Sequence, residues 1–427
     1  MKIIEKPLKQ VLKQINNDYK GSFNEDQKVE ENVKKILKEV SQKGDRAIKI
    51  YEKEFDQIKL DDFKVSKDEI NKAYKKTSSQ LKEALEAAKK NITSFHKLEL
   101  EKNFIDSKKK GVFRGEKITP LASVGIYVPG GTAAYPSSLL MNAIPAKVAG
   151  VKKIVMVTPP QKNGLNKTVL AAAKVVGIDQ IYTVGGAQAI GALAYGTQSI
   201  PKVDKITGPG NIFVAKAKRQ VYGQVGIDMI AGPSEICIIA NIQSDPKQVA
   251  ADLLSQAEHD KRARPILITD SKKLVKKVQL ELKQQVKFLP RREIAEGSLN
   301  NKGMIIKVEN IDQAFIVANK IAPEHLEVQL PEAASYLNQI KNAGSVFLGF
   351  SASEPVGDYL AGPNHILPTG GTALFSSPLG VYDFVKRTQF ISYTRKALSK
   401  EKNAITQLAR AEGLEAHARA IESRFKK

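Results

Sequence analysis

Two short segments of the sequence pair side chains that are able to move protons or to bind a metal ion. Gln256 and His259 stand three residues apart at the end of an amphipathic helical pattern, so both side chains can reach one point from one helix face. Glu324 and His325 are neighbours directly after another helical pattern, and a carboxylate beside an imidazole forms a natural acid/base pair. The spacing predicts these two pairs and leaves open whether they serve acid/base chemistry or metal binding.

The remaining candidates for chemistry lie in a loop and in the C-terminal tail. His365 closes a turn-rich loop that also carries Glu354 and Asp358, and His417 follows Glu412 by five residues. No H-E-x-x-H or C-x-x-C spacing is present, so local spacing does not establish a metal site. A site that combines the helix end, the loop and the tail requires three distant segments to converge.

Two residues with reactive side chains have a structural interpretation instead. His96 has no polar or glycine-rich surroundings, and we expect it to be a surface or packing histidine. Cys237, the single cysteine, could attack an aldehyde as a nucleophile. Its apolar run 236–240 is typical of a buried strand, where a free cysteine behaves as a small apolar residue, so we favour packing.

Clusters of glycine and proline form a second kind of signal. They are expected at the carboxyl ends of strands, where open α/β sheets bind ligands. The clusters are Pro129-Gly130-Gly131, Gly185-Gly186, Gly208-Pro209-Gly210 and Gly232-Pro233-Ser234. Glycine lets backbone N–H groups approach a phosphate, but none of these clusters is the G-x-G-x-x-G dinucleotide fingerprint. Together they suggest a nucleotide or anion site, and tight turns without a ligand remain the alternative.

Alternating strands and helices must position these residues. From about residue 112, β-branched runs alternate with helical patterns, which is typical of parallel sheets with crossover helices. The expected strands are 153–157, 180–184, 203–206, 236–240, 266–269, 303–307 and 345–348. The expected helices are 167–176, 187–195, 247–258, 272–287 and 312–321. Two series of similar size predict two related α/β modules.

Both ends of the chain are expected to be helical. In the first hundred residues, apolar side chains at helical spacing predict helices over 26–40, 44–55 and 67–97. From about residue 382 the strand pattern is lost. Residues 404–410 and 414–425 predict a helical tail that Gly413 divides into two helices.

The bulk composition restricts the class of protein. A chain of 427 residues exceeds what one hydrophobic core usually serves, so we expect at least two domains. With 42% hydrophobic and 26% charged residues, the chain is typical of globular rather than disordered proteins. One cysteine fits a reducing, cytoplasmic compartment. No signal-peptide pattern and no apolar run of roughly 20 residues is visible, so no membrane partner is expected.

The formal net charge of +22 has two interpretations. A strongly basic protein can bind nucleic acid through phosphate contacts. Here the lysines alternate with glutamates on amphipathic helices and outnumber the arginines, without an aromatic-interleaved basic patch. We therefore favour a lysine-rich solvated surface that assists capture of an anionic dinucleotide, and we expect no nucleic-acid partner.

Longer motifs follow one another in a fixed order along the chain. The first group is Gly125-Ile126-Tyr127-Val128-Pro129-Gly130-Gly131, Tyr135-Pro136-Ser137-Ser138, Val184-Gly185-Gly186-Ala187-Gln188-Ala189-Ile190, Thr207-Gly208-Pro209-Gly210-Asn211 and Ala231-Gly232-Pro233-Ser234-Glu235. The second group is Ser255-Gln256-Ala257-Glu258-His259-Asp260, Ala322-Pro323-Glu324-His325-Leu326, Gly357-Asp358-Tyr359, Pro363-Asn364-His365, Glu412 and His417. In this order, from about residue 30 to the C-terminus, they resemble the histidinol dehydrogenase family. Each motif is modest alone, and their combination is specific.

The resemblance implies an α/β fold of two related, incomplete Rossmann-like modules with parallel sheets, a helical N-terminal segment and a small helical C-terminal tail domain. We expect an N-terminal segment over 1–25, a first α/β domain over 26–126 and 235–381, a second, NAD-contacting α/β domain over 127–234, and a tail over 382–427. The family is a homodimer that exchanges this tail. Shared active sites and an inactive monomer are therefore implied.

The resemblance also implies the reaction. The family oxidises L-histidinol to L-histidine with two NAD molecules in succession, through an enzyme-held aldehyde, as the last step of histidine biosynthesis. In family terms His325 is the base that removes the hydroxyl proton, and Glu324 activates the water that hydrates the aldehyde. A neutral imidazole with a pKa near ~6.5 suits the first task. The cofactor NAD would be contacted by Tyr127, Gln188 and Asn211.

Metal and substrate ligands are implied in the same way. One Zn²⁺ per subunit would be held by Gln256, His259, Asp358 and His417, a nitrogen and oxygen donor set that zinc accepts, and would orient the substrate. The substrate would also contact Ser234, His325 and Glu412, with Glu412 paired to its ammonium group, and His365 would assist. Two alternatives remain: a related zinc and NAD dehydrogenase for another amino alcohol, and a basic nucleic-acid-binding protein with a degenerate enzyme fold.

Overall fold

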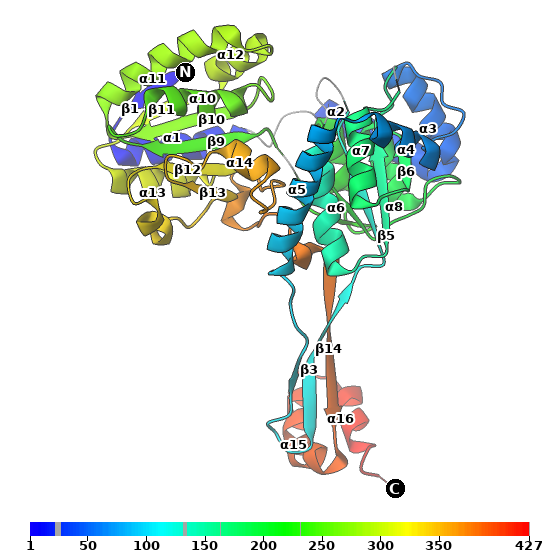
Figure 1. The fold of residues 1–427 in the computed structure, drawn as a ribbon. Helices are drawn as coiled ribbons and strands as arrows, with labels where there is room; N and C mark the ends of the chain where they lie inside the picture. Colours follow the sequence, from blue (N-terminus) through cyan, green and yellow to red (C-terminus); the bar gives the residue numbers. More distant parts are fainter. Residues whose placement is uncertain (22–26, 131–134, 163, 231, 427) are drawn as a thin grey trace. The chain divides into compact units, whose positions relative to one another are not determined.

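The computed structural model describes residues 1–21, 27–130, 135–162, 164–230 and 232–426. Its internal contacts divide the chain into two compact units, one of Met1–Glu99 with Ala122–Phe384 and one of Leu100–Leu121 with Val385–Lys427. The first unit contains two parallel sheets, and the second contains an antiparallel sheet and two helices (Figure 1). Residues Asp26, Gly131 and Ala231, which entered the predicted helix and two of the predicted motifs, lie outside the described residues.

The first sheet of the larger unit has six parallel strands in the order β1-β11-β10-β9-β12-β13. Their bounds are β1 Lys2–Glu5, β9 Glu235–Ala240, β10 Arg264–Thr269, β11 Met304–Lys307, β12 His325–Gln329 and β13 Ser345–Leu348. The chain builds β9, β10 and β11 in one direction and then returns to place β12 on the other side of β9. The strand order therefore reverses between β9 and β12.

Helices cover both faces of this sheet (Figure 1). One face carries α10 Pro246–Ala257, α11 Lys272–Gln285 with the 3-10 turn η2 Val286–Phe288, and α12 Arg292–Asn301; the other carries α1 Leu8–Gly21 and α13 Ile311–Ile321. Ile236 and Ile238 belong to the core of the first face, and Cys237 and Ile239 to the core of the second. Because both faces are buried, the strand is apolar at every position rather than at alternate ones.

The second sheet has five parallel strands in the order β6-β5-β4-β7-β8. Its strands are β4 Ser123–Tyr127, β5 Lys153–Thr158, β6 Ile181–Thr183, β7 Lys205–Thr207 and β8 Gly226–Ile227. The connecting helices are α6 Pro136–Ala149, α7 Lys167–Val176, α8 Gly186–Tyr195 and α9 Ile212–Val221. Here the strand order reverses between β4 and β7. Such reversal points are where open α/β sheets bind ligands.

The helices of the N-terminal region cover this second sheet. They are α2 Gln27–Lys43, α3 Asp45–Tyr51, the π-helical turn η1 Glu52–Asp56, α4 Lys67–Lys76 and α5 Ser79–Lys97. Val33 and Leu37 of α2 share one core with Ile190 and Leu193 of α8, and α4 and α5 contact α7 and α6. The prediction that residues 26–126 join the first α/β domain is therefore wrong, because an amphipathic pattern does not specify which sheet a helix will cover. The predicted separate segment 1–25 likewise contributes β1 to the first sheet.

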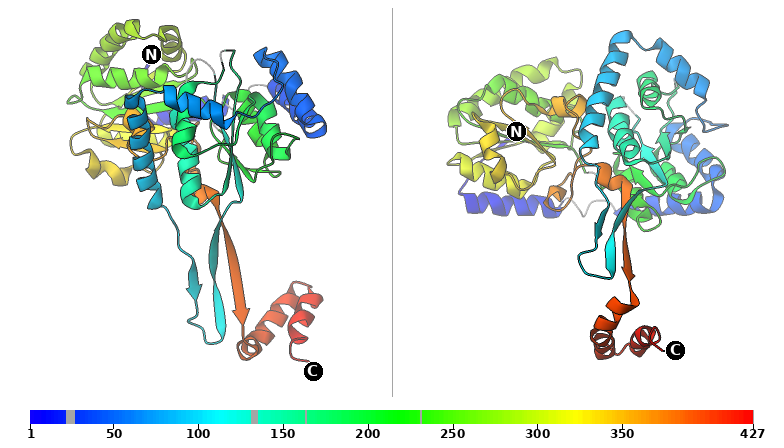
Figure 2. Two further views of the ribbon diagram at one scale, coloured as in Figure 1. Left: turned by 45° about the vertical axis from the view of Figure 1, so that its right-hand side comes forward. Right: turned by 60° about the horizontal axis from the view of Figure 1, so that its bottom comes forward.

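The second unit contains a three-stranded antiparallel sheet, which the sequence analysis did not predict. Its strands β2 Phe104–Asp106, β3 Val112–Pro120 and β14 Val385–Tyr393 are arranged in the order β14-β3-β2. Figure 2 shows the two long strands side by side. The helices α15 Arg395–Ala411 and α16 Glu415–Glu422 follow, and Gly413 separates them with a φ of 78° as expected. The tail is helical only after Tyr393, because β14 pairs with a strand more than 250 residues earlier in the chain.

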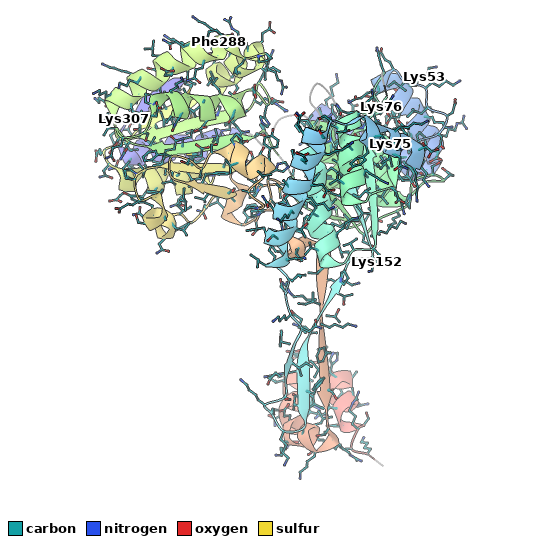
Figure 3. The ribbon with its side chains drawn as sticks, viewed as in Figure 1. Lys53, Lys75, Lys76, Lys152, Phe288 and Lys307 are labelled. Carbon is teal, nitrogen blue, oxygen red and sulfur yellow. The ribbon has the colours of Figure 1, made fainter. Side chains whose placement is uncertain are left out.

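Most predicted elements of the two parallel sheets are confirmed, some at the same residues, such as helix α7 and strand β13. The predicted helix 67–97 is two helices, because Ser78 caps a new one by accepting the Leu81 N–H. Strands β1, β4, β8 and β12 and helices α1, α6, α9 and α12 were not predicted. Lysines such as Lys53, Lys75 and Lys152 point away from the ribbon (Figure 3). In the described parts of the chain, no helix combines the length and the apolar character needed to cross a membrane.

Candidate active site

Glu324 and His325 are positioned by an abrupt end of helix α13. The helix ends at Ile321, and Ala322 adopts a left-handed backbone with a φ of 49°, which is unfavourable for a residue with a Cβ. Pro323 then prevents any continuation of the helix. The chain leaves in an extended conformation, and His325 becomes the first residue of β12. The predicted acid/base pair thus lies at a helix–strand junction, with both side chains buried.

A close approach of two chain segments fixes this junction. The carbonyl oxygen of Glu324 accepts the Ser345 N–H at 2.9 Å. A Cβ at Gly344 would lie 2.5 Å from the same oxygen, so only glycine fits there. The entry of β12 is therefore held against the start of β13.

The pair lies at the amino edge of the first sheet, not at the carboxyl edge. His325 begins β12, Glu235 begins β9, and these are the strands between which the order reverses. Gly232 and Ser234 directly precede β9, so the expectation that all glycine clusters follow strands was wrong for this one. Ligand sites in open α/β sheets are expected at the carboxyl ends of parallel strands, so this expectation did not predict a site at the amino edge.

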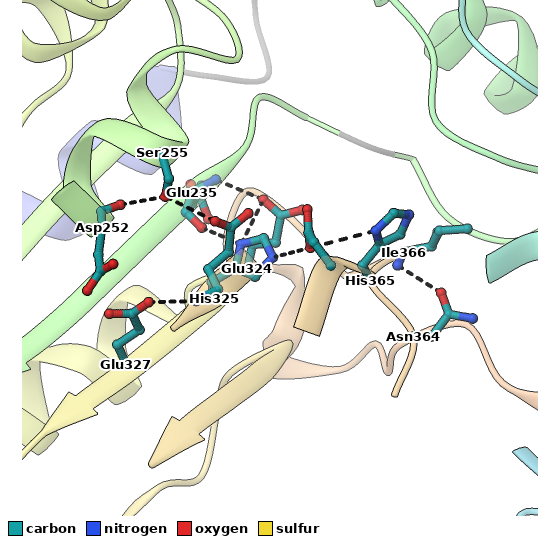
Figure 4. A network of polar contacts seen from close by, with 11 residues as sticks. Glu235, Asp252, Ser255, Glu324, His325, Glu327, Asn364, His365 and Ile366 are labelled. Carbon is teal, nitrogen blue, oxygen red and sulfur yellow. Dashed lines mark hydrogen bonds and ion pairs between the residues drawn. The ribbon is translucent and has the colours of Figure 1, made fainter. Parts of the chain in front are cut away.

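The backbone N–H and carbonyl groups of one residue, Glu235, orient both catalytic candidates. The Glu235 N–H donates to Glu324 Oε2 at 2.8 Å, and the Glu235 carbonyl oxygen lies 3.0 Å from His325 Nδ1 (Figure 4). A carbonyl oxygen can only accept, so Nδ1 carries the proton and the lone pair of the neutral ring is on Nε2. The Glu235 side chain is anchored by Arg264 at 2.8 Å and by the Gly370 N–H at 3.2 Å. The backbone of β9 therefore fixes the tautomer of His325.

Several buried carboxylates control the protonation of this pair. Burial opposes the charged form of His325, but Glu324, Asp358 and Glu354 outweigh it and raise its pKa to about 10. Burial raises the pKa of Glu324 to about 8 against the attraction of His325. Both side chains thus hold protons near neutral pH while the surrounding negative charge is uncompensated.

The loop after β13 brings a second carboxylate and a second histidine to the pair. Asp358 lies in helix α14 Glu354–Tyr359, with its Oδ1 3.8 Å from His325 Nε2 and 3.6 Å from His365 Nδ1. The neighbouring imidazoles lower the pKa of Asp358 although burial opposes them. Among the described residues, His325, Glu354 and Asp358 offer ligand atoms within 4.8 Å of one another. His325 and Asp358, together with His365, line a cavity of about 250 Å³.

Gln256 and His259 lie at the end of helix α10, as predicted. Gln256 is buried in the last turn, and its Oε1 has no hydrogen-bond partner among the described residues. His259 follows the cap residue of the helix, and burial lowers its pKa, which keeps the imidazole neutral and able to bind a metal. The field of Asp358 acts on His259, so the two side chains are near one another. The contacts of the described residues do not bring all four predicted metal ligands, Gln256, His259, Asp358 and His417, together at one point.

A chain of buried polar groups supports the site from behind (Figure 4). Ser255 Oγ donates to Glu354 Oε2 at 3.0 Å, and the Glu354 N–H donates to Glu327 Oε1 at 2.8 Å. Gln329 Nε2 donates to both Glu327 and Asp252. Burial and the neighbouring acid raise the pKa of Glu327 to about 8. These hydrogen bonds link helix α10, strand β12 and helix α14 to one another.

The three residues predicted to contact a dinucleotide lie at the carboxyl edge of the second sheet. Tyr127 ends β4, Gln188 is in the first turn of α8, and Asn211 caps α9 by accepting the Phe213 and Val214 N–H groups. Tyr127 and Asn211 flank the reversal point between β4 and β7. Tyr127 and Gln188 are almost fully buried.

The other predicted site residues are placed as follows. Ser234 is half-buried directly before β9. Glu412 caps α15, His417 lies in α16, and both side chains are exposed within the second unit. Their part in the site of the first unit stays a prediction.

Cys237, which we assigned to packing, and His96, which we expected on the surface or in packing, are both buried. Cys237 lies inside β9, where burial raises the pKa of its thiol, so the packing interpretation is confirmed. His96 is buried at the end of α5, with Nδ1 2.7 Å from Glu99.

Sequence reasoning missed two residues that shape this site. Glu235 stands in one of the motifs, but it acts through its backbone N–H and its backbone carbonyl group, which side-chain patterns do not reveal. Glu354 was noted in its loop without a role, and the structure places it beside Asp358. Its signal was its spacing, because Glu354 stands four residues before Asp358 and the two side chains share one face of a helix.

Comparison with known proteins gives one consistent family. The family model for histidinol dehydrogenase matches residues 20–425. A histidinol dehydrogenase of Lactiplantibacillus plantarum is 64% identical over 400 residues, which cover 94% of each chain. One from Listeria monocytogenes is 56% identical over 425 residues, with 100% of this chain and 99% of the relative covered.

The fold agrees with a solved structure of the same name. The crystal structure of histidinol dehydrogenase from Elizabethkingia anophelis superimposes with a TM-score of 0.93 at 36% sequence identity, covering 100% of this chain and 98% of the other. The predicted α/β fold with two parallel sheets is thereby confirmed.

Proposed function

The chain belongs to the histidinol dehydrogenase family, and from this premise we propose how its residues divide the work of the last step of histidine biosynthesis. The family enzyme is NAD-dependent. The reaction converts a primary alcohol, water and two NAD⁺ into a carboxylate, two NADH and protons. The observation that carries the proposal is the His325 ring, which has Nδ1 bound to the Glu235 carbonyl and Nε2 buried without a hydrogen-bond partner among the described residues.

His325 serves as the base of the first oxidation. Hydride leaves the carbinol carbon only as the O–H proton is removed, and Nε2 is the atom that accepts it. The bond from Nδ1 to Glu235 prevents the ring from turning away. A His325→Asn variant should lose turnover while it keeps its metal content.

Glu324 serves as the base of the second oxidation. It removes a proton from the water that adds to the aldehyde, and the hydrate then gives up a second hydride. Its Oε2 is held by the Glu235 N–H, which leaves Oε1 for this water. The two bases are adjacent in sequence and are oriented by the backbone of one residue, Glu235, so one reaction centre can meet both in turn.

We assign one Zn²⁺ to Gln256, His259, Asp358 and, from the tail, His417. The donor set fits the ion, because a buried and unpartnered amide oxygen, a neutral imidazole and a carboxylate are groups that zinc accepts. When bound, the ion supplies positive charge and orients the imidazole and amine of the substrate. The buried cluster of His325, Glu354 and Asp358 shares Asp358 with this set and supports a cation in this region.

NAD is assigned to the carboxyl edge of the second sheet, at Tyr127, Gln188 and Asn211. Support comes from their place around the reversal point of that sheet. The substrate is assigned to Ser234, Glu412 and His365 in addition to the metal ligands, with Glu412 paired to its ammonium group.

A homodimer with exchanged tails is part of the proposal. The second unit has little core of its own: its buried hydrophobic side chains among the described residues are Val112, Ala397, Ala409 and Ala418. Large apolar side chains are exposed instead, with Ile391 at 72% and Leu408 at 67%. Such a small unit needs another surface to be stable.

A cytoplasmic location is also part of the proposal, because the buried thiol of Cys237 is free, which fits a reducing compartment.

A coupled measurement tests this function. Purified protein with zinc, NAD⁺ and L-histidinol should form about two NADH per histidinol consumed, and a chelator should abolish the signal. The protein without added zinc, and the His325→Asn variant with zinc, are the matched controls. Absence of NADH after zinc reconstitution would contradict the proposal. Loss of zinc from His325→Asn would reassign that residue to the metal.

A further inference from the structure

A buried glutamate lies next to the proposed dinucleotide site and takes no part in the mechanism above. Glu52 begins the π-helical turn η1 and has no exposed surface. Around it is an apolar core formed by α2, α3, α8 and the second sheet. A π-turn within a helical region often marks a functional position, and a buried acid in an apolar core needs a reason to be there.

The carboxyl group of Glu52 contacts the turn that opens helix α8. Its Oε1 accepts the Gly185 N–H at 3.1 Å and the Gln188 Nε2 group at 2.9 Å. The next N–H of this turn, from Gly186, donates to the Tyr127 hydroxyl at 3.2 Å. Two N–H groups that could have met a phosphate are therefore used within the chain.

These contacts determine which way the amide of Gln188 faces. Because Nε2 donates to Glu52, Oε1 must point to the other side. This Oε1 is buried and has no partner among the described residues. A Cβ at Gly186 would lie 2.7 Å from it, so the glycine leaves room for this orientation. A buried acceptor without a donor is unfavourable, and an N–H or O–H group of a ligand bound at this turn would satisfy it.

The charged groups that face Glu52 favour its neutral form. Burial raises the pKa of Glu52 to about 8, and Asp56, one turn later, adds to the effect. Burial also raises the pKa of Asp56 and that of Tyr127, whose hydroxyl stays neutral. A protonated Glu52 keeps Oε1 as the acceptor for the α8 turn and carries its proton on Oε2, which is buried without a hydrogen-bond partner among the described residues. In this state no negative charge stands beside the anionic dinucleotide.

We propose that Glu52 is a positioning residue for NAD, which holds the Gln188 amide so that its Oε1 accepts a hydrogen bond from an N–H or O–H group of the dinucleotide. The inference rests on the proposed contact between Gln188 and NAD. Glu52 itself touches neither NAD nor the reacting atoms. It acts through Gln188, and its effect should fall on NAD binding and not on the chemical step.

Three variants of the full-length, zinc-loaded enzyme test this. Glu52→Ala removes the hold on Gln188, and losing one such hydrogen bond should raise KM for NAD by about tenfold. The kcat value and the KM for histidinol should change by less than about threefold. Glu52→Gln mimics the protonated acid, which also accepts through one atom and donates through the other, and should restore KM for NAD to within about twofold. Glu54→Gln, on an exposed position of the same turn, is the control.

A pH series and a truncated ligand complete the test. The wild-type KM for NAD should rise above about pH 8, where Glu52 loses its proton, and that of Glu52→Gln should not. ADP-ribose should lose affinity in Glu52→Ala if the donor is a ribose or adenine group, and should bind normally if it is the nicotinamide carboxamide. This pH comparison also decides the matter if Glu52→Ala fails to fold.

The outcomes separate the inference from the function on which it rests. Wild-type protein without turnover or NAD binding would overturn both. Wild-type turnover together with an unchanged KM for NAD in Glu52→Ala would overturn the inference alone. So would a Glu52→Gln enzyme that binds NAD as weakly as Glu52→Ala, or one that keeps the wild-type pH dependence.

Discussion

Glu324→Gln should separate the two oxidations. The glutamate is buried, and its Oε2 accepts the Glu235 N–H at 2.8 Å. A glutamine of the same shape keeps an oxygen acceptor for this N–H, and its side chain cannot take up a proton. Because burial already raises the pKa of Glu324 to about 8, the protein holds it largely neutral at pH 7, so a neutral amide should be tolerated by the fold.

The expected effect falls on the second oxidation only. His325 is intact and removes the alcohol proton, so the first hydride transfer proceeds. Loss of a general base slows the step it serves by roughly 10²- to 10⁴-fold, so hydration of the aldehyde and the second hydride transfer should stall. In a single turnover, Glu324→Gln should form about one NADH per enzyme-bound histidinol where the wild type forms about two.

The pH dependence follows from the raised pKa of Glu324. A carboxyl group with a pKa of about 8 is roughly one-tenth ionised at pH 7 and fully ionised well above pH 8. Only the ionised form can accept a proton, so oxidation of added aldehyde should accelerate with rising pH, by at most about tenfold from pH 7. The positive field of a bound cation shifts this rise to lower pH, so pH 8 is its upper limit. Glu324→Gln should show no such rise.

Stopped-flow absorbance of NADH, with enzyme in excess over histidinol, measures both amplitude and rate. The control is wild-type enzyme given the aldehyde directly, which should yield one NADH. The reasoning is refuted if Glu324→Gln still forms two NADH at the wild-type rate. It is equally refuted if this variant loses the first NADH, because Glu324 would then serve the alcohol step.

Three other perturbations have defined outcomes. Coexpression of His325→Asn chains with His417→Asn chains should recover about one quarter of wild-type activity. Random pairing makes half of the dimers mixed, and an exchanged tail leaves one of the two sites intact in each mixed dimer. No recovery of activity would place both residues in the site of a single chain. Arg264→Ala leaves the carboxylate of Glu235 buried without this ion pair. The free energy of unfolding, measured in urea, should therefore fall by about 3–5 kcal/mol, and a loss under about 1 kcal/mol would contradict this. The pKa of Glu52 in the folded protein lies above its unfolded value of 4.5, so the wild type should lose stability as pH rises from about 4.5 to about 8. Glu52→Gln should not lose stability in this way. If the difference in stability between the two proteins does not change with pH, the raised pKa of Glu52 is refuted.

The sequence predicted most of the strands of the two parallel sheets, although not β1, β4 or β8, because burial on both faces leaves a continuous apolar run such as that of β9. It failed for β12, which is fully buried but reads His-Leu-Glu-Val-Gln. Here Glu327 and Gln329 bond to each other and to Asp252, so polar side chains occupy core positions without disturbing the sheet. A pattern based on hydrophobicity alone does not detect such a strand.

Only those parts of the site whose residues are close together in the sequence could be predicted. The spacing of Gln256 and His259 and the adjacency of Glu324 and His325 predict two pairs, and the structure confirms where each pair lies. That Asp358 approaches His325 depends on the return of the chain after β13, and no local pattern contains this. The family resemblance supplied that step in advance, because a family motif records the outcome of folding without explaining it.

The charge around His325 connects the base with the cation. Glu324, Asp358 and Glu354 surround one imidazole, and their combined field raises its pKa to about 10. The same crowding, after burial, raises the pKa of Glu354 to about 7. An imidazole with such a pKa is protonated at neutral pH and cannot accept a proton from an alcohol. Positive charge at Asp358 offsets this field and lowers the pKa of His325 towards the range of a working base. We therefore expect a cation at Asp358 to assist the first oxidation itself, and not only the binding of the substrate.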